Sequence, residues 1–177
     1  MPRFSPIEIL VLVVVLAAAF TDIRSRKIPN WLTLAGICAG LSLNTYLSGW
    51  GGLLTSLEGL LLGFGAYVLL YALRAMGAGD VKLMAAVGAI VGPSNWFMIF
   101  VASALAGGAL AVILMVWKGR IKQTLMNSLY ITSELIHFRP PYARRSDLDV
   151  KDPRALNMPH AVAIATGTVA CLAFAYI

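Results

Sequence analysis

Two aspartates stand out because each borders a long apolar stretch that carries almost no other charge. Asp80 comes directly after a Gly-x-Gly formed by Gly77 and Gly79. Asp22 ends another apolar run and has three basic residues close behind it. A carboxylate near the hydrocarbon core of a membrane is costly and usually has a function. Two acids in such similar settings suggest a carboxylate pair.

Two carboxyl groups that share a site cannot both ionise easily, so near neutral pH such a pair tends to hold one proton. The ionised member can take a proton from water while the protonated member polarises a carbonyl. This is the chemistry of aspartic peptide hydrolysis. Asp22 and Asp80 could instead form ion pairs in a structural subunit, or a proton relay in a small ion-coupled transporter. The residues alone leave all three alternatives open.

No competing catalytic set is visible in the sequence. Cys38 and Cys171 both lie inside apolar runs, where we interpret them as small core residues. His137 and His160 do not stand at metal-ligand spacing from either cysteine. The serines form no nucleophile-elbow pattern. We therefore expect neither a metal site nor a cofactor.

The composition indicates a single membrane domain over residues 1–177 that is all-α. Of the 177 residues, 59% are hydrophobic and 12% are charged, whereas a soluble domain carries about a quarter charged residues. The apolar runs are continuous rather than alternating, which favours helices over a β-barrel. The net charge of +6 comes from residues between the apolar runs, so we expect contact with the lipid bilayer and not with nucleic acid.

The apolar runs predict six transmembrane helices, at about residues 7–20, 31–49, 53–76, 81–92, 96–117 and 158–177. We expect the first run to be retained, because its cations follow it as in a stop-transfer segment. The fourth run is too short to cross a membrane unaided. The connector 118–157 has an amphipathic first half, which we expect to lie on the membrane surface.

Small residues and one acid within these runs predict how the helices pack. Gly59, Gly63 and Gly65 lie on or near one helix face, and Gly107-Gly108 forms a second notch for close packing. Glu58, on the same run as the first three, has two interpretations. It either snorkels toward water or makes a polar contact inside the bundle.

The basic residues predict the orientation of the chain in the membrane. Every Lys and Arg except Arg3 falls in 23–30, near the turn before Asp80, or in 118–157. Six crossings put these three connectors on one side, which the positive-inside rule makes cytoplasmic. We therefore expect a multi-pass protein of the bacterial inner (plasma) membrane with both termini outside. Asp22 and Asp80 would then lie near the cytoplasmic face.

Two local patterns narrow the choice of function. They are TDIRSRKIPN over residues 21–30 and GAGDVKL over residues 77–83. Together and in this order, they resemble the type IV prepilin peptidases, which are membrane aspartic peptidases of the Gly-x-Gly-Asp class. The order of the helices and the Pro159 segment before the last one also fit, so the resemblance covers nearly the whole chain.

The resemblance implies an endopeptidase with Asp22 and Asp80 as its catalytic dyad. Its substrates would be prepilin or pseudopilin precursors, whose short basic leader is cut at the cytoplasmic face. Gly77 and Gly79 would let the substrate backbone approach Asp80. Lys82 would lie near the dyad or the lipid head groups, and we group it with Gly77 and Gly79 as a candidate substrate-binding residue.

The chain departs from the larger members of this family. Those carry a cysteine-rich cytoplasmic domain between the first two helices and also methylate the new amino terminus. Here that connector is residues 23–30, and no cysteine lies outside an apolar run. The resemblance therefore implies cleavage without N-methylation. It is closest to the small peptidases of Flp (tight-adherence) pilins, with archaeal preflagellin peptidases as a second alternative. The sequence does not indicate an oligomeric state.

Overall fold

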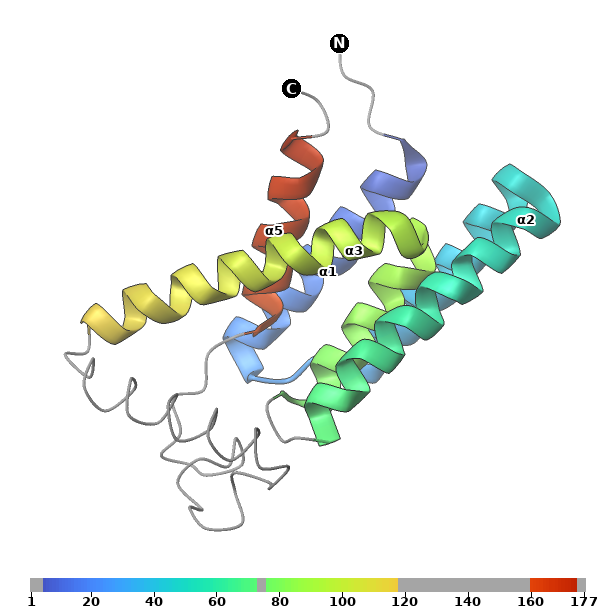
Figure 1. Cartoon of the computed structure of the whole chain (residues 1–177). Helices are drawn as coiled ribbons and strands as arrows, with labels where there is room; N and C mark the ends of the chain where they lie inside the picture. Colours follow the sequence, from blue (N-terminus) through green and yellow to red (C-terminus); the bar gives the residue numbers. More distant parts are fainter. Residues whose placement is uncertain (1–4, 73–75, 118–159, 175–177) are drawn as a thin grey trace, which may run out of the picture.

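The computed structural model describes residues 5–72, 76–117 and 160–174, which form four helices in chain order (Figure 1). They are α1 (Pro6–Ser25), α2 (Asn30–Ala72), α3 (Ala78–Trp117) and α5 (His160–Phe174). No strand occurs among these residues, so the all-α class is confirmed for them. By length and apolar composition α1, α2 and α3 can each cross a membrane, and α5 is apolar but shorter. Six crossings stay a prediction.

The two longest helices are each broken by one glycine. Gly49 in α2 has φ 61° and ψ −140°, and Gly92 in α3 has φ 75° and ψ 173°. Glycine enters this part of conformational space without the steric cost that a Cβ would add. Each long helix is therefore two helical segments, and Figure 1 shows α2 folding back on itself. The breaks fall at the ends of the expected segments 31–49 and 81–92.

Helix α1 begins at a capping box, in which Ser5 and Glu8 each bind the other's backbone N–H. It runs through Ser25, five residues past the expected end of 7–20. The expectation followed the apolar run, but a helix continues through polar residues when its backbone bonds remain satisfied. It ends at Arg26, which has left-handed dihedrals and donates its N–H to the carbonyl of Asp22 over 2.9 Å.

The centre of the bundle is the first segment of α3, in which every residue from Leu83 to Ile90 is buried. Helices α1, α2 and α5 all contact α3. Gly59 of α2 lies so close to Gly88 that a Cβ on either one would collide with the other's carbonyl. Gly63 is packed in the same way against the carbonyl of Met84. The predicted close packing at Gly59 and Gly63 is confirmed.

Asn44 connects both halves of α2 to α3 through hydrogen bonds that the sequence did not suggest. Its Nδ2 donates to Ser56 Oγ and to the carbonyl of Ile90, each over 2.9 Å. Ser56 Oγ in turn donates to the carbonyl of Ala89 over 2.7 Å. These bonds hold the α2 hairpin against the end of the first α3 segment.

Glu58 is exposed, which fits the first of its two interpretations and excludes the second, a polar contact inside the bundle. Two other expectations about packing were wrong. Gly65 and Gly108 have nothing within 4 Å of the place where a Cβ would stand. Cys38 is exposed and so is no core residue, while Cys171 is partly buried. The outer surface of a membrane protein is as apolar as its interior, so hydrophobicity alone does not separate the two faces. The connector 118–157 lies outside the described residues.

Candidate active site

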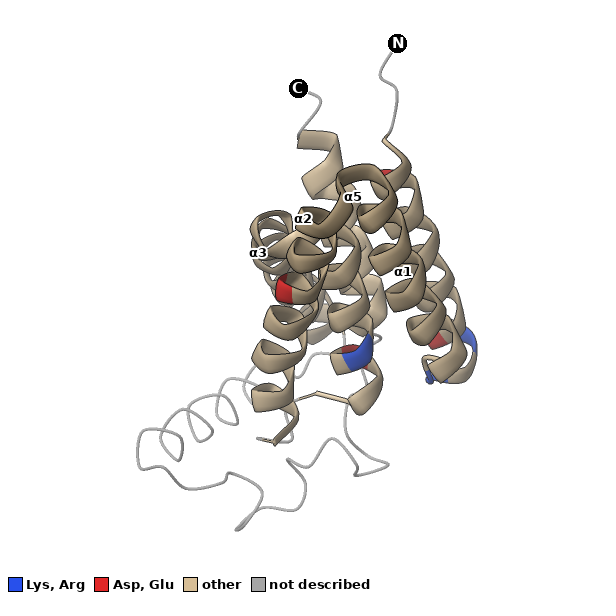
Figure 2. Ribbon diagram, turned by 90° about the vertical axis from the view of Figure 1, so that its right-hand side faces the viewer, with Lys and Arg blue, Asp and Glu red and all other residues tan. Residues whose placement is uncertain are grey.

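Charged residues gather at one end of the bundle, where α1 ends and where α2, α3 and α5 begin. Figure 2 shows acidic and basic positions at the end of α1 and at the start of α3, on the same end of the molecule. Asp22 lies in the last turn of α1, and Asp80 lies in the first turn of α3. The fold thus brings both sequence-predicted acids to one end, although 57 residues separate them in the chain.

Asp80 is held by the glycine that precedes it by three residues. Its N–H donates to the Gly77 carbonyl over 3.2 Å, and its Oδ2 accepts the Gly77 N–H over 3.3 Å. The sequence placed Asp80 in a connector, but α3 already begins at Ala78. A carboxylate is favoured in a first turn because it can accept unpaired backbone N–H groups at the positive end of the helix. The side chain is buried, with 8% of its surface exposed.

Asp22 is held by a helix far away in the sequence. Its Oδ2 accepts the backbone N–H of Ala161, the second residue of α5, over 3.2 Å. The first N–H groups of a helix have no partner within it, so the carboxylate of Asp22 satisfies one of them. Asp22 is partly buried. The last helix therefore docks directly on one of the two acids.

The two acids interact electrostatically. The charges of His160 from α5 and of Asp22 from α1 both act on the Asp80 carboxyl. Tyr67 of α2, a buried residue, is within electrostatic range of Asp80 as well. Four helices thus each contribute one titratable side chain to the same region. The arrangement is suited to two carboxyls that share one proton.

The short connector between α1 and α2 packs against the start of α3. The Ile28 side chain fills the space beside Gly79, where a Cβ would lie 3.3 Å from the Ile28 Cβ. Lys82 is exposed and donates from Nζ to Asn30 Oδ1 over 2.9 Å. The two sequence patterns therefore contact each other. A Cβ at Gly79 would be in tight contact with Ile28, which would have to shift slightly. The expected approach of a substrate backbone to Gly79 stays a prediction.

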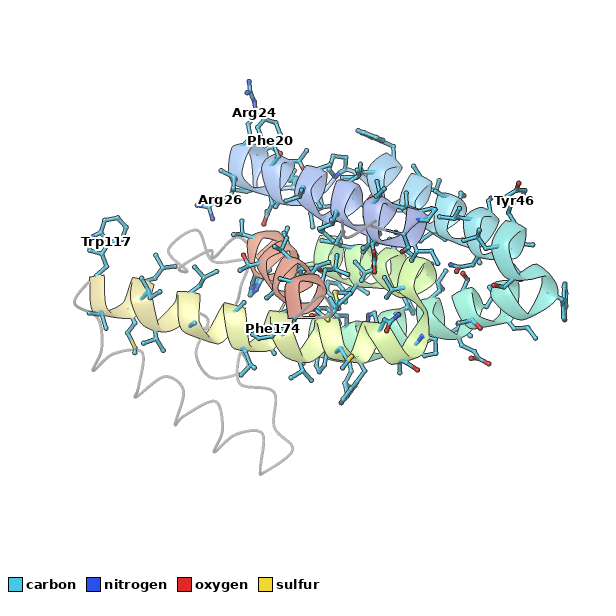
Figure 3. The ribbon with its side chains drawn as sticks, turned by 90° about the horizontal axis from the view of Figure 1, so that it is seen from above. Phe20, Arg24, Arg26, Tyr46, Trp117 and Phe174 are labelled. Carbon is cyan, nitrogen blue, oxygen red and sulfur yellow. The ribbon has the colours of Figure 1, made fainter. Side chains whose placement is uncertain are left out.

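The basic residues behind Asp22 lie on the outside of the molecule. Arg24 and Lys27 are exposed, and in Figure 3 the Arg24 and Phe20 side chains point away from the bundle. Arg24 is thus placed to meet lipid head groups or water rather than Asp80. This position suits a role in fixing membrane orientation.

Sequence reasoning missed two groups of this region. His160 was considered only as a metal ligand and rejected, although an ionisable residue at the edge of an apolar segment was itself a signal. Tyr67 gave no signal, because one tyrosine in an apolar helix is ordinary. Both join the site through contacts between helices that lie far apart in the sequence.

One comparison with known proteins identifies the family. The model of the type IV leader peptidase family matches residues 9–112, which is more than half of the chain. The matched segment contains both sequence patterns and both acids. No curated protein and no solved structure matches the chain. The resemblance drawn from the two patterns is confirmed, and the chain belongs to the type IV leader peptidase family.

Proposed function

We propose that this chain is a membrane-embedded aspartic endopeptidase with Asp22 and Asp80 as its catalytic dyad. It removes the short basic leader of Flp-type prepilins or pseudopilins at the cytoplasmic face of the membrane. Family membership supports a peptidase. The observation that supports the dyad is that Asp22 in the last turn of α1 and Asp80 in the first turn of α3 lie at the same end of the bundle, where the charge of Asp22 acts on the Asp80 carboxyl.

In the proposed reaction the pair begins with one proton. The ionised carboxyl takes a proton from a water molecule as its oxygen attacks the scissile carbonyl carbon. The protonated carboxyl gives its proton to the carbonyl oxygen and so stabilises the tetrahedral intermediate. When the C–N bond breaks, the carboxyl that took its proton from water gives it to the leaving nitrogen, and the other carboxylate takes a proton back from a hydroxyl of the intermediate. The products are the free leader and a pilin with a new amino terminus, and the pair again holds one proton.

The hydrogen bonds from backbone N–H groups leave acceptor sites on both carboxylates for water and substrate. Within the described residues, the hydrogen bonds to both carboxylates go to Oδ2. An ionised carboxylate has about four lone-pair sites, so each acid keeps acceptor capacity for water or a peptide. The transporter alternative gains no support from the family match.

The proposal is tested by co-expression with a Flp-type prepilin. Asp22→Asn and Asp80→Asn should each leave the precursor uncut, because either change removes one half of the shared-proton pair. Glu58→Gln is the matched control, since Glu58 is an exposed acid on α2 away from the proposed dyad. Each variant must be made and inserted at the level of the parent chain. Processing by either Asn variant would remove that aspartate from the dyad.

The absence of methyl transfer is a second, separable part of the proposal. Mass spectrometry of the matured pilin should show an unmodified amino group, because the chain lacks the cytoplasmic domain that larger relatives carry between their first two helices. A methylated amino terminus made by this chain alone would contradict that part and leave the peptidase assignment intact.

A further inference from the structure

His160 occupies a position that ties the two acids together. It is the first residue of α5 and is partly buried, and the next residue, Ala161, donates the N–H that Asp22 accepts. Ala161 itself is fully buried. The turn that carries the imidazole is therefore fixed against the end of α1, and His160 cannot move far from Asp22 without breaking that hydrogen bond.

His160 also acts on the second acid. Among the described residues, the charges of His160 and of Asp22 both act on the Asp80 carboxyl. An imidazolium favours the ionised form of a nearby carboxyl, whereas a second carboxylate opposes it. His160 can thus offset the repulsion between Asp22 and Asp80, together with the Gly77 N–H that Asp80 accepts.

We propose that His160 is a positioning residue of the active site, which acts through the carboxyl pair and not on the peptide. Its backbone turn orients Asp22, and its imidazolium holds the Asp22–Asp80 pair at one proton when the pH falls. This inference rests on the proposed peptidase function and deepens it. A pair that gained a second proton would have no base to activate water.

Among the residues that the structure describes, His160 is the one histidine, and imidazole is the side chain that ordinarily titrates between about pH 5 and 8. The other described ionisable groups near this end of the bundle are the acids Asp22 and Asp80, the phenols of Tyr67 and Tyr71, the exposed cations Arg24, Arg26 and Lys27, and Lys82, which is bonded to Asn30. The cations stay charged throughout that range.

Imidazole side chains are ordinarily charged below about pH 6 and neutral toward pH 8. The loss of His160 should therefore lower the cleavage rate most at low pH, where a positive charge opposes a second protonation of the pair, and little near pH 8. A residue with a purely structural role would lower the rate by the same factor at every pH.

The test measures prepilin cleavage by the purified protein in lipid nanodiscs from pH 5 to 8. His160→Gln should lower kcat about tenfold near pH 5.5 and less than about twofold near pH 8, as expected for the loss of one nearby charge at partial burial. KM should change less than about twofold. His160→Lys keeps the charge at every pH and should restore the rate at low pH. Thr166→Val is the control, because Thr166 is exposed and bonds only within α5.

A second readout needs no substrate and separates the two proposals. Infrared titration should show more protonated carboxyl in His160→Gln than in the parent chain near pH 5.5, and the excess should vanish when Asp80→Asn is added. If no prepilin is cleaved but this excess is seen, the peptidase proposal fails, and only the electrostatic interaction between His160 and the carboxyl pair is supported. If cleavage occurs but His160→Gln changes neither the pH profile nor the infrared titration, the role of His160 is overturned.

Discussion

Within the part of the chain that the structure describes, each proposed catalytic aspartate accepts one backbone N–H through its side chain. Asp80 takes its hydrogen bond from Gly77, three residues away, and Asp22 takes its own from Ala161, 139 residues away. A charge-assisted bond of this kind orients a carboxylate without using up its acceptor sites. The Gly-x-Gly-Asp pattern already places Gly77 close to Asp80 in the sequence. The contact between Ala161 and Asp22 is seen only in the folded structure, because nothing in the residues near Asp22 indicates α5 as its partner.

Lys82 and Asn30 should act as one unit that holds the α1–α2 connector against α3. Lys82→Met and Asn30→Leu each remove the 2.9 Å bond between them, and each should lower the free energy of unfolding by up to about 1 kcal/mol, because the pair is exposed. The double variant should be no less stable than the worse single one. Thermal unfolding in detergent measures all three.

Cleavage gives the same pair of residues a functional readout. All three variants should keep more than about a tenth of the parent rate, since neither side chain contacts the reacting atoms in our account. If Lys82→Met alone loses activity as completely as Asp80→Asn does, Lys82 is instead a catalytic residue.

At the level of helices, the sequence predicted where segments break better than where they begin. Gly49 and Gly92 stand at the breaks because their positive φ values suit glycine, and both were expected as the last residues of their segments, 31–49 and 81–92. The predicted end of α1 and the predicted start of α3 were wrong because Asp22, Ser25 and Asp80 are polar and were assigned to connectors. Helical backbone continues into polar residues where caps and side chains complete its hydrogen bonds.

The α2–α3 contact at Gly59 should tolerate no side chain. Gly59→Ala would bring a Cβ into the carbonyl of Gly88, and overpacking of this kind costs about 1–3 kcal/mol. Gly65→Ala is the matched control on the same helix segment, where a Cβ meets open space, and should be neutral or slightly stabilising. The free energies of unfolding of the two variants are measured and compared in nanodiscs. Equal stability would show that the close approach of α2 and α3 is wrong.

Asn44 should be a second determinant of the same contact. Asn44→Leu removes the donor shared by Ser56 and Ile90, which should cost about 1–2 kcal/mol, the upper range for hydrogen bonds between membrane helices. Asn95→Leu serves as the comparison, because Asn95 is exposed and bonds only the carbonyl of Val91 within α3. A larger loss for Asn95→Leu than for Asn44→Leu would contradict the assignment.

At the scale of the whole molecule, the site is assembled by helices that meet only in the folded bundle. The two acids and the family were predictable because each acid sits within a short pattern of its own. His160, Tyr67 and the Ala161 N–H were not predictable, because they depend on α2 and α5 docking at the ends of α1 and α3. Local sequence encodes turns, caps and apolar runs, whereas these contacts join residues far apart in the chain.

The predicted orientation places the site on the cytoplasmic side. In a chain freed of Cys38 and Cys171, Ser25→Cys should react with a membrane-impermeant thiol reagent only from the cytoplasm. Ser48→Cys, beside the Gly49 break, should react only from outside, because one segment of α2 separates the two positions. Both residues are exposed. Labelling of both from the same side would refute the predicted topology.

The pairing of Asp22 with Asp80 is tested most directly by joining the two positions. A cysteine-free chain with Asp22→Cys and Asp80→Cys should be linked within one molecule by a short bifunctional thiol reagent, identified by mass spectrometry of the linked peptides. Asp22→Cys with Glu58→Cys should not be linked, because Glu58 lies on the exposed face of α2. If both cysteines of the first pair react singly but never with each other, the two acids do not form one site and the proposed mechanism is wrong.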